Sequence, residues 1–269
     1  MKGYGLIEDI VELGAYILGD NKVPWIPYQE DGDWEPYLPK YEPQAEHFET
    51  NGCTVWGTQN QIETFYKRLY GIEPNFSERF NYLLTPVNPD RGVDPQKVYE
   101  CIRKHGLIDH RLLPVTRTRA QFLDETDITN SMLAKGIHWR ETHDFRHEWL
   151  WRNPEKRPAN WKQLLKDALK TSPIGVSVTA WTENEYGLFV SLSGNNHYCL
   201  LYKIADYKGH ADCMFIFDTY DHTKKVLHPD HNVRRAKRIW LNQTTSKRKL
   251  RKHMTILERI VDFIKKNLR

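Results

Sequence analysis

The sequence predicts an α+β fold in which helices come first along the chain and strands come second. Up to about residue 170, apolar residues recur at spacings of three or four, which is typical of helices. After Ser172-Pro173 the chain changes to short apolar and aromatic runs, which are typical of strands. Because the two kinds of element are segregated, we expect two lobes with a ligand-binding cleft between them.

The N-terminal region is predicted to hold a short helix and an extended arm. Apolar residues at helical spacing favour a helix over 6–18. Residues 20–45 are rich in proline, glycine, aspartate and tryptophan, which favours an extended segment that wraps the main domain. We assign this helix and arm to residues 1–45.

Three further helices are predicted before the strands. The first begins near Cys53 and ends near Gly71. The second can be capped by Asp94, has a proline in its first turn, and ends at Gly106. The third covers about 160–170, with its apolar residues on one side.

The strand region and the C-terminal tail follow. The predicted strands are 174–181, 186–191, 198–204, 213–218 and 238–241. We therefore place the main domain at 46–245. Residues 246–269 combine a basic run with an apolar helical stripe, which predicts a helix that docks either on a partner protein or on its own domain.

Composition limits the class of protein. Of the 269 residues, 39% are hydrophobic and 12% aromatic, enough for a large packed core. A net charge of +4 is too small to favour a nucleic-acid partner. The N-terminus is acidic and lacks a signal-peptide core, and no stretch reaches membrane-spanning length. We expect a cytoplasmic or virion-associated protein.

The four cysteines show no paired spacing typical of a zinc site. Cys101, Cys199 and Cys213 fall inside apolar helix or strand patterns, where free cysteine is a common small core residue. We expect these three to be reduced and buried, with no disulfide supporting the domain.

Cys53, His197 and Asp218 form a candidate catalytic set. Cys53 follows a turn signal at 51–52 and so begins a helix, while His197 follows a predicted exposed turn at 194–196. A helix N-terminus and an imidazolium both favour a thiolate, and a carboxylate can orient the imidazole. The structural alternatives are a core cysteine, a buried strand histidine and an aspartate that caps a turn.

The chain resembles the papain-like cysteine peptidases over about residues 40–240. Residues 49–63 (ETNGCTVWGTQNQIE) and the dipeptide Asn196-His197 resemble the family's nucleophile helix and histidine strand. Residues 91–114 resemble its second helix and following turn, and residues 172–181 its first sheet-lobe strand. The resemblance implies a two-lobe fold with the cysteine on the helical lobe and the histidine on an antiparallel sheet lobe. It also implies that Gln44 supplies an oxyanion-hole donor.

The chain departs from the family at several positions. Thr50 replaces a half-cystine, and Thr54 replaces the aromatic residue after the nucleophile. Gln44 lies nine residues before Cys53, which is further than usual. Asp218 replaces the usual asparagine, as in the transglutaminase-like branch. No long pro-segment precedes the domain, which is similar to standalone bacterial and bacteriophage forms.

The resemblance implies a cysteine endopeptidase that hydrolyses peptide or protein substrates through a thioester, without a metal or organic cofactor. Two other functions stay open. One is a non-catalytic structural or adaptor protein, for instance in a virus particle. The other is a transglutaminase-like transfer of the acyl group to an amine.

Two groups of polar residues are weaker candidates. His143 and His147 lie four residues apart beside Glu148, but the stretch is not clearly helical and a third metal ligand is not indicated, so we expect no metal there. The histidines and aspartates of residues 221–231 are interpreted as a solvated polar loop.

Overall fold

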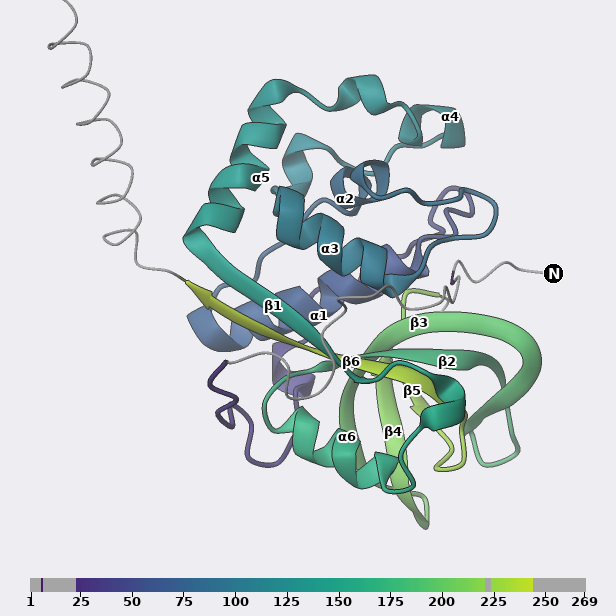
Figure 1. Cartoon of the computed structure of the whole chain (residues 1–269). Helices are drawn as coiled ribbons and strands as arrows, with labels where there is room; N and C mark the ends of the chain where they lie inside the picture. Colours follow the sequence, from purple (N-terminus) through teal and green to yellow (C-terminus); the bar gives the residue numbers. More distant parts are fainter. Residues whose placement is uncertain (1–5, 7–22, 221–223, 244–269) are drawn as a thin grey trace, which may run out of the picture.

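The computed structural model describes Leu6, residues 23–220 and residues 224–243, except for the side chains of residues 193–195. Apart from Leu6, the helix expected over 6–18 lies outside the described residues, as does the C-terminal tail. Figure 1 shows helices gathered on one side of the molecule and a sheet on the other, with the long helix α1 between them.

The described residues form six α-helices, α1 to α6, and four short 3-10 helices, η1 to η4. Most belong to the helical lobe, whereas α6 packs on the sheet. The α-helices are α1 (Cys53–Tyr70), α2 (Glu78–Leu84), α3 (Pro95–His105), α4 (Arg119–Phe122), α5 (Asn130–Thr142) and α6 (Trp161–Leu169). The 3-10 helices are η1 (Glu35–Tyr37), η2 (His110–Leu112), η3 (Glu125–Asp127) and η4 (Pro154–Lys156).

The strands of the described residues form a six-stranded sheet in the order β1-β6-β2-β3-β4-β5, in which neighbours run antiparallel. Their bounds are β1 (His143–Trp151), β2 (Ile174–Glu183), β3 (Phe189–Tyr207), β4 (His210–Phe217), β5 (Lys224–Leu227) and β6 (Val233–Gln243). The long, curved β3 joins two strands that the sequence predicts separately (Figure 1). The turn predicted at 194–196 is wrong, because the backbone continues as strand through these residues.

Helix α1 is buried on every side over its first part, from Cys53 to Phe65, because it lies between the two lobes. Its close approach to β3 depends on Gly57, where a Cβ would lie 3.0 Å from the Tyr198 ring. One turn separates Gly57 from Cys53, so both face the same way, and Tyr198 follows His197 in sequence. This contact therefore fixes the cysteine helix against the histidine strand.

Local signals set the helix ends that the sequence predicts. Gly71 ends α1 in the left-handed conformation (φ 66°), which glycine adopts without strain. The Asp94 side chain caps α3 by accepting from the Gln96 backbone N–H at 2.8 Å, with Pro95 in the first turn. These predictions are confirmed.

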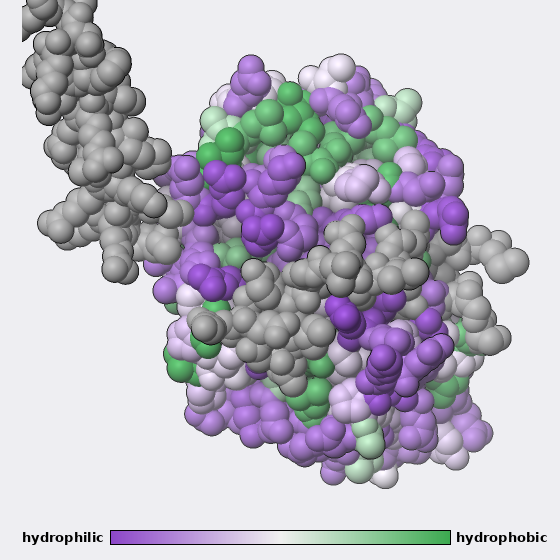
Figure 2. Space-filling model, in the orientation of Figure 1, coloured by the Kyte–Doolittle hydropathy of each residue, from purple (hydrophilic) through white to green (hydrophobic). Residues whose placement is uncertain are grey.

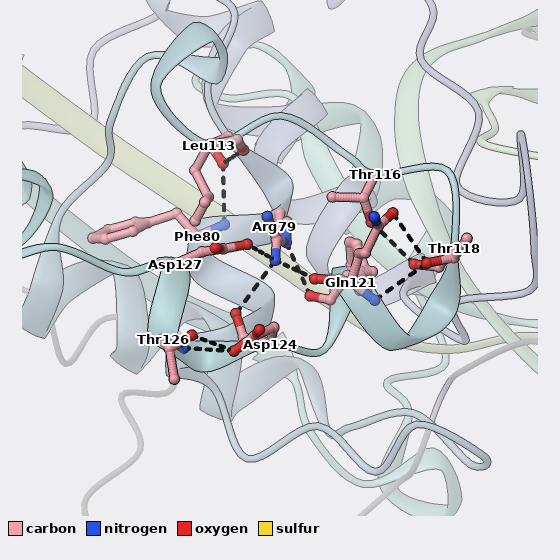
Figure 3. Close-up of polar contacts among 11 residues, drawn as sticks. Arg79, Phe80, Leu113, Thr116, Thr118, Gln121, Asp124, Thr126 and Asp127 are labelled. Carbon is pink, nitrogen blue, oxygen red and sulfur yellow. Dashed lines mark hydrogen bonds and ion pairs between the residues drawn. The ribbon is translucent and has the colours of Figure 1, made fainter.

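Arg79 holds the irregular segment that contains α4 and η3 (Figure 3). Its buried guanidinium donates to the Phe122 carbonyl at 2.9 Å and to the Asp127 carboxylate at 2.6 Å. Phe122 is thereby fixed against Trp56 on α1, with ring centroids 6.3 Å apart, and against Tyr82 at 4.7 Å. The first turns of the cysteine helix are therefore supported from the helical lobe.

The arm contributes to the core. Trp34 is fully buried and donates its indole N–H to the Leu169 carbonyl at 2.6 Å, while its backbone N–H donates to Tyr202 at 2.9 Å. The Tyr28 backbone N–H also bonds the Lys170 carbonyl at 2.8 Å. The arm thus connects the helical lobe to α6 and β3.

The four cysteines are free and buried, as predicted for Cys101, Cys199 and Cys213. Figure 2 shows hydrophilic residues over most of one face, with apolar residues gathered over the helical lobe at the top. Among the described helices, not one combines the length and apolar character that crossing a membrane requires.

Candidate active site

Cys53 is the first residue of α1, directly after a tightly held turn. The Thr50 side chain accepts from the Gly52 backbone N–H at 3.1 Å and donates to the Gln44 carbonyl at 2.9 Å. A Cβ on Gly52 would lie 2.4 Å from the Trp56 ring, so only glycine fits there. The predicted turn before Cys53 is confirmed, and it places the thiol at the N-terminal end of the helix.

His197 and Asp218 approach Cys53 from the sheet lobe. His197 lies on β3 opposite Val178 of β2, and Asp218 directly follows β4. The imidazole Nε2 lies 2.6 Å from Asp218 Oδ1, and Cys53 lies near enough to interact electrostatically with the imidazole. All three residues are buried. The structure therefore brings the three residues singled out in the sequence together at one buried site.

The charges of this group stabilise an imidazolium beside a carboxylate. Burial opposes the charged form of His197, but the Asp218 carboxylate and contacts with Cys53 outweigh it and raise the pKa of His197 to about 10. Burial likewise acts to raise the pKa of Asp218, but His197 and Lys225 outweigh it and hold that pKa below its ordinary value. The pair is therefore ionised at neutral pH.

Lys225 is a member of this site that the sequence analysis missed. This residue on β5 is only 4% exposed and forms an ion pair with Asp218 Oδ2. Its ammonium also donates to the Tyr220 carbonyl at 2.7 Å and lies 5.2 Å from the centre of the Trp181 ring. Asp218 thus joins two cations, the imidazolium through one oxygen and the ammonium through the other.

Two aromatic rings cover the histidine. The Trp181 ring meets His197 edge-on with centroids 5.2 Å apart, and the Tyr220 ring lies at 5.5 Å. The Tyr220 hydroxyl donates to the Glu49 carboxylate at 2.6 Å, which connects this cover to the chain just before Cys53. The rings exclude water from the His197–Asp218 contact and so strengthen it.

Gln44 is 1% exposed and lies beside the chain that follows Asp218. Its Oε1 accepts from the Thr219 hydroxyl at 2.6 Å, and its backbone N–H donates to the Thr219 carbonyl at 3.2 Å. Its Nε2 is buried without a hydrogen-bond partner among the described residues. A turn over residues 44–48 accommodates the long spacing to Cys53. A buried amide donor without a partner is suited to donate a hydrogen bond to an acceptor on a ligand.

Comparisons with known proteins identify the fold. No family model and no curated protein matches the sequence. Among solved structures, the chain is similar to xylellain, a cysteine protease from Xylella fastidiosa, with a TM-score of 0.61 at 15% identity over 91% of this chain and 97% of that one. The fold is papain-like. The predicted α+β architecture, with helices and an antiparallel sheet in separate lobes, is confirmed.

Other papain-like structures agree. The recombinant stem bromelain precursor gives a TM-score of 0.58 at 14% identity, over 91% of this chain and 78% of that one. The bromelain protease from Ananas comosus in complex with the E64 inhibitor gives 0.56 at 15% identity, over 79% and 98%. At these identities the similarity concerns the fold, and the chemistry has to be argued from this chain's own residues.

The weaker candidates of the sequence analysis are not brought together in the papain-like fold. Residues 143–151 form strand β1, so His143 and His147 do not share a helix face. His147 Nε2 lies 3.1 Å from Glu100 on α3, and Glu148 pairs with Arg238 at 2.5 Å. These side chains therefore connect β1 to its neighbours.

The interpretation of residues 221–231 as a solvated loop is wrong for His231. Its side chain is 1% exposed and hydrogen-bonds the Thr179 carbonyl at 2.8 Å and the Phe189 carbonyl at 3.1 Å. It joins β2 to the start of β3. Residues 221–223 lie outside the described residues.

The N-terminal segment also lies near the start of α1. Leu6 is buried and forms a parallel bridge with Val93. The Val93 carbonyl accepts from the Thr54 hydroxyl at 3.3 Å, one residue after Cys53. Val93 therefore connects Leu6 to Thr54, the residue that follows Cys53.

Proposed function

We propose that the protein is a cysteine endopeptidase that hydrolyses peptide bonds through a thioester. The observation that carries this proposal is that Cys53, at the start of α1, lies beside His197, which in turn bonds Asp218. A thiol at a helix N-terminus beside an imidazolium is an activated nucleophile. The papain-like fold supports the same chemistry, and no step needs a metal or an organic cofactor.

The proposed reaction has two halves. The Cys53 sulfur attacks the carbonyl carbon of the substrate, the C–N bond breaks, and the His197 imidazolium gives its proton to the leaving amine. A water molecule then attacks the thioester while His197 takes its proton, and the thiolate leaves. Asp218 holds the imidazole in orientation throughout.

The oxyanion of each tetrahedral intermediate needs donors that are in place beforehand. The Cys53 backbone N–H is one candidate, because the first N–H groups of a helix have no partner within it. The Gln44 Nε2 is the other, since it is buried and has no hydrogen-bond partner among the described residues. Thr219 fixes the orientation of that amide by donating to its oxygen at 2.6 Å.

Lys225 adapts the site to an aspartate. An aspartate brings a buried negative charge that the family's asparagine lacks, and a buried charge is costly unless it is paired. The ion pair with Lys225 supplies the compensating charge. It also limits how strongly Asp218 stabilises the imidazolium, which has to give up its proton in the first half-reaction.

Labelling with an electrophilic peptide probe tests the proposal. The probe should modify Cys53 far faster than the other cysteines, and Cys53→Ala should abolish both labelling and peptide hydrolysis while the fold persists. Cys101→Ala is the control, because Cys101 is a buried cysteine of the helical lobe and should leave labelling unchanged. A Cys53 that is no more reactive than Cys101 would favour a structural or adaptor protein.

Acyl transfer to an amine is the second candidate, favoured by the Cys–His–Asp composition of the site. Hydrolysis of a peptide in the presence of a primary amine separates the two, since transfer would yield an amide product detectable by mass spectrometry.

We also propose that residues 246–269 form a tail that binds a protein partner. Deleting them should then leave the labelling rate of Cys53 unchanged, and a truncated protein that fails to fold would place the tail in the domain core.

A further inference from the structure

A second group of titratable side chains lies outside the candidate active site, in the helical lobe. Glu42 belongs to the arm, Glu78 is the first residue of α2, and His110 is the first residue of η2. The His110 Nδ1 lies 3.5 Å from Glu78 Oε2 and 3.7 Å from Glu42 Oε2. One ligand atom from each residue lies within 4.8 Å of the others. Three separate segments thus direct potential ligands to one point.

The contacts within this group are too long to satisfy its polar atoms. Glu78 is 2% exposed, and neither its Oε2 nor the His110 Nδ1 has a hydrogen-bond partner among the described residues. A separation of 3.5 Å exceeds the usual range of an N–H···O bond. Buried polar atoms without partners are rare and costly, so these two atoms point to a group that would lie between them.

The charge around this point is also unbalanced. Glu63 is buried and interacts electrostatically with Glu78 and Glu42, so three carboxyl groups lie near one another, two of them beside the His110 imidazole. In the part of the chain that the structure describes, the only basic side chain that pairs with Glu42 or Glu78 is His110. A bound cation would lower the mutual repulsion of these carboxyl groups.

The spacing agrees with coordination of a transition-metal ion. Bonds of about 2.0 to 2.2 Å in a tetrahedron separate neighbouring ligand atoms by about 3.3 to 3.5 Å. The observed 3.5 and 3.7 Å need only a small closure. An imidazole with two carboxylates suits Zn²⁺ and related ions, whereas Ca²⁺ prefers six or more oxygen ligands. We propose that Glu42, Glu78 and His110 form a binding site for a divalent cation of the Zn²⁺ class.

Asn75 supports this assignment by holding two of the ligands. Its side-chain amide donates to Glu42 Oε1 at 2.5 Å, and its carbonyl accepts from the His110 backbone N–H at 2.9 Å. Such outer contacts orient ligand side chains around a metal ion. Because Glu42 is two residues before Gln44, a bound cation would fix the arm that carries the candidate oxyanion donor. The site itself does not depend on the proposed peptidase activity.

Zn²⁺ binding to the 269-residue chain tests the proposal. The Cys53→Ala protein is used, so that the active-site thiol cannot bind the probe, and Zn²⁺ is titrated by calorimetry after treatment with a chelator. A single Zn²⁺ should bind per chain, and at hundredfold excess over Kd the unfolding midpoint should rise by about 5 to 10 °C. Amide hydrogen exchange over residues 38–48 should slow on binding.

Glu78→Gln and His110→Asn, each in the Cys53→Ala protein, should weaken Zn²⁺ binding by about 100-fold or more. Glu46→Gln is the matched control, because Glu46 is an exposed carboxylate of the same arm. Its binding should equal that of the parent. If the parent did not bind Zn²⁺, these side chains would form an ion pair and not a metal site. Equal binding in the parent and in both ligand variants would place the ion elsewhere. Either result would overturn the proposal.

Discussion

Replacing Lys225 by methionine tests the electrostatics of the site most directly. Methionine has a similar length and can pack against the Trp181 ring, but it removes the ammonium that neutralises Asp218. Among the described residues, the carboxylate then keeps His197 at 2.6 Å and the Thr219 backbone N–H at 2.8 Å. We expect the variant to fold, with lower stability and with a histidine that is harder to deprotonate.

The size of both effects follows from burial. Removing one partner of a buried ion pair costs about 3 to 5 kcal/mol, and the contacts that Asp218 retains place Lys225→Met near the lower limit. For a domain of this size, about 3 kcal/mol lowers the unfolding midpoint by about 6 to 12 °C. Loss of the like charge that shares the Asp218 carboxylate should raise the pKa of His197 further. Hydrolysis should slow, because a weaker acid protonates the leaving amine less readily.

A double-mutant cycle separates this account from simple loss of packing. Asp218→Asn alone would leave the buried ammonium of Lys225 without its carboxylate. It should therefore lower the free energy of unfolding, although papain-like peptidases commonly have an asparagine at this position. The combined Asp218→Asn/Lys225→Met variant leaves neither charge and should recover about 2 kcal/mol or more relative to the sum of the single changes. Urea unfolding and the pH dependence of probe labelling measure the two effects. Additive costs, or a labelling profile that Lys225→Met does not move, would refute the reasoning.

Three further predictions concern the same site. Gln44→Ala should slow peptide hydrolysis about 100-fold, the effect of losing one oxyanion donor, while costing only about 1 kcal/mol of stability; lost stability with an unchanged rate would exclude Gln44 from the oxyanion hole. Leu6→Asp should speed the labelling of Cys53, because Leu6 is buried against Val93 beside the turn of the thiol, and an unchanged rate would show that Leu6 does not cover it. The raised pKa of His197 contributes stability that is complete below about pH 6.5 and is lost as the pH rises through about 10. Urea unfolding between pH 6 and 10 should show this decline, and it should flatten in His197→Gln; an equal decline in that variant would assign the pH dependence to other groups.

The sequence predicted well those features that depend on local chemistry. The turn at 51–52, the helix that begins at Cys53, and the capped helix after Asp94 are set by glycine, aspartate and proline, whose backbone preferences act within a few residues. The approach of His197 to Cys53 was predicted from their order and element types together with the family resemblance. Their contact in the structure depends on β3 packing against α1.

The sequence misled where sheet pairing overrides local preference. Residues 194–196 have turn-forming composition, yet Asn196 pairs with Thr179 and His197 with Val178, so the strand continues. Residues 143–151 were missed as a strand, because most of their polar side chains are buried against neighbouring elements and obscure the alternation. In both places, residues distant in sequence supply the partners that decide the structure.

The role of Lys225 could not be predicted from the pattern of apolar residues. It occupies an inward position of a short strand where an apolar side chain would ordinarily be expected, and its reason to be there lies seven residues away in Asp218. The available signal was the aspartate itself. An asparagine needs no counter-ion, whereas a buried aspartate that already bonds a histidine supports two cations through its two oxygens. A carboxylate in place of a family's neutral residue therefore predicts a buried base nearby, and the aromatic ring of Trp181 beside the Lys225 ammonium shows how the fold accommodates that second charge.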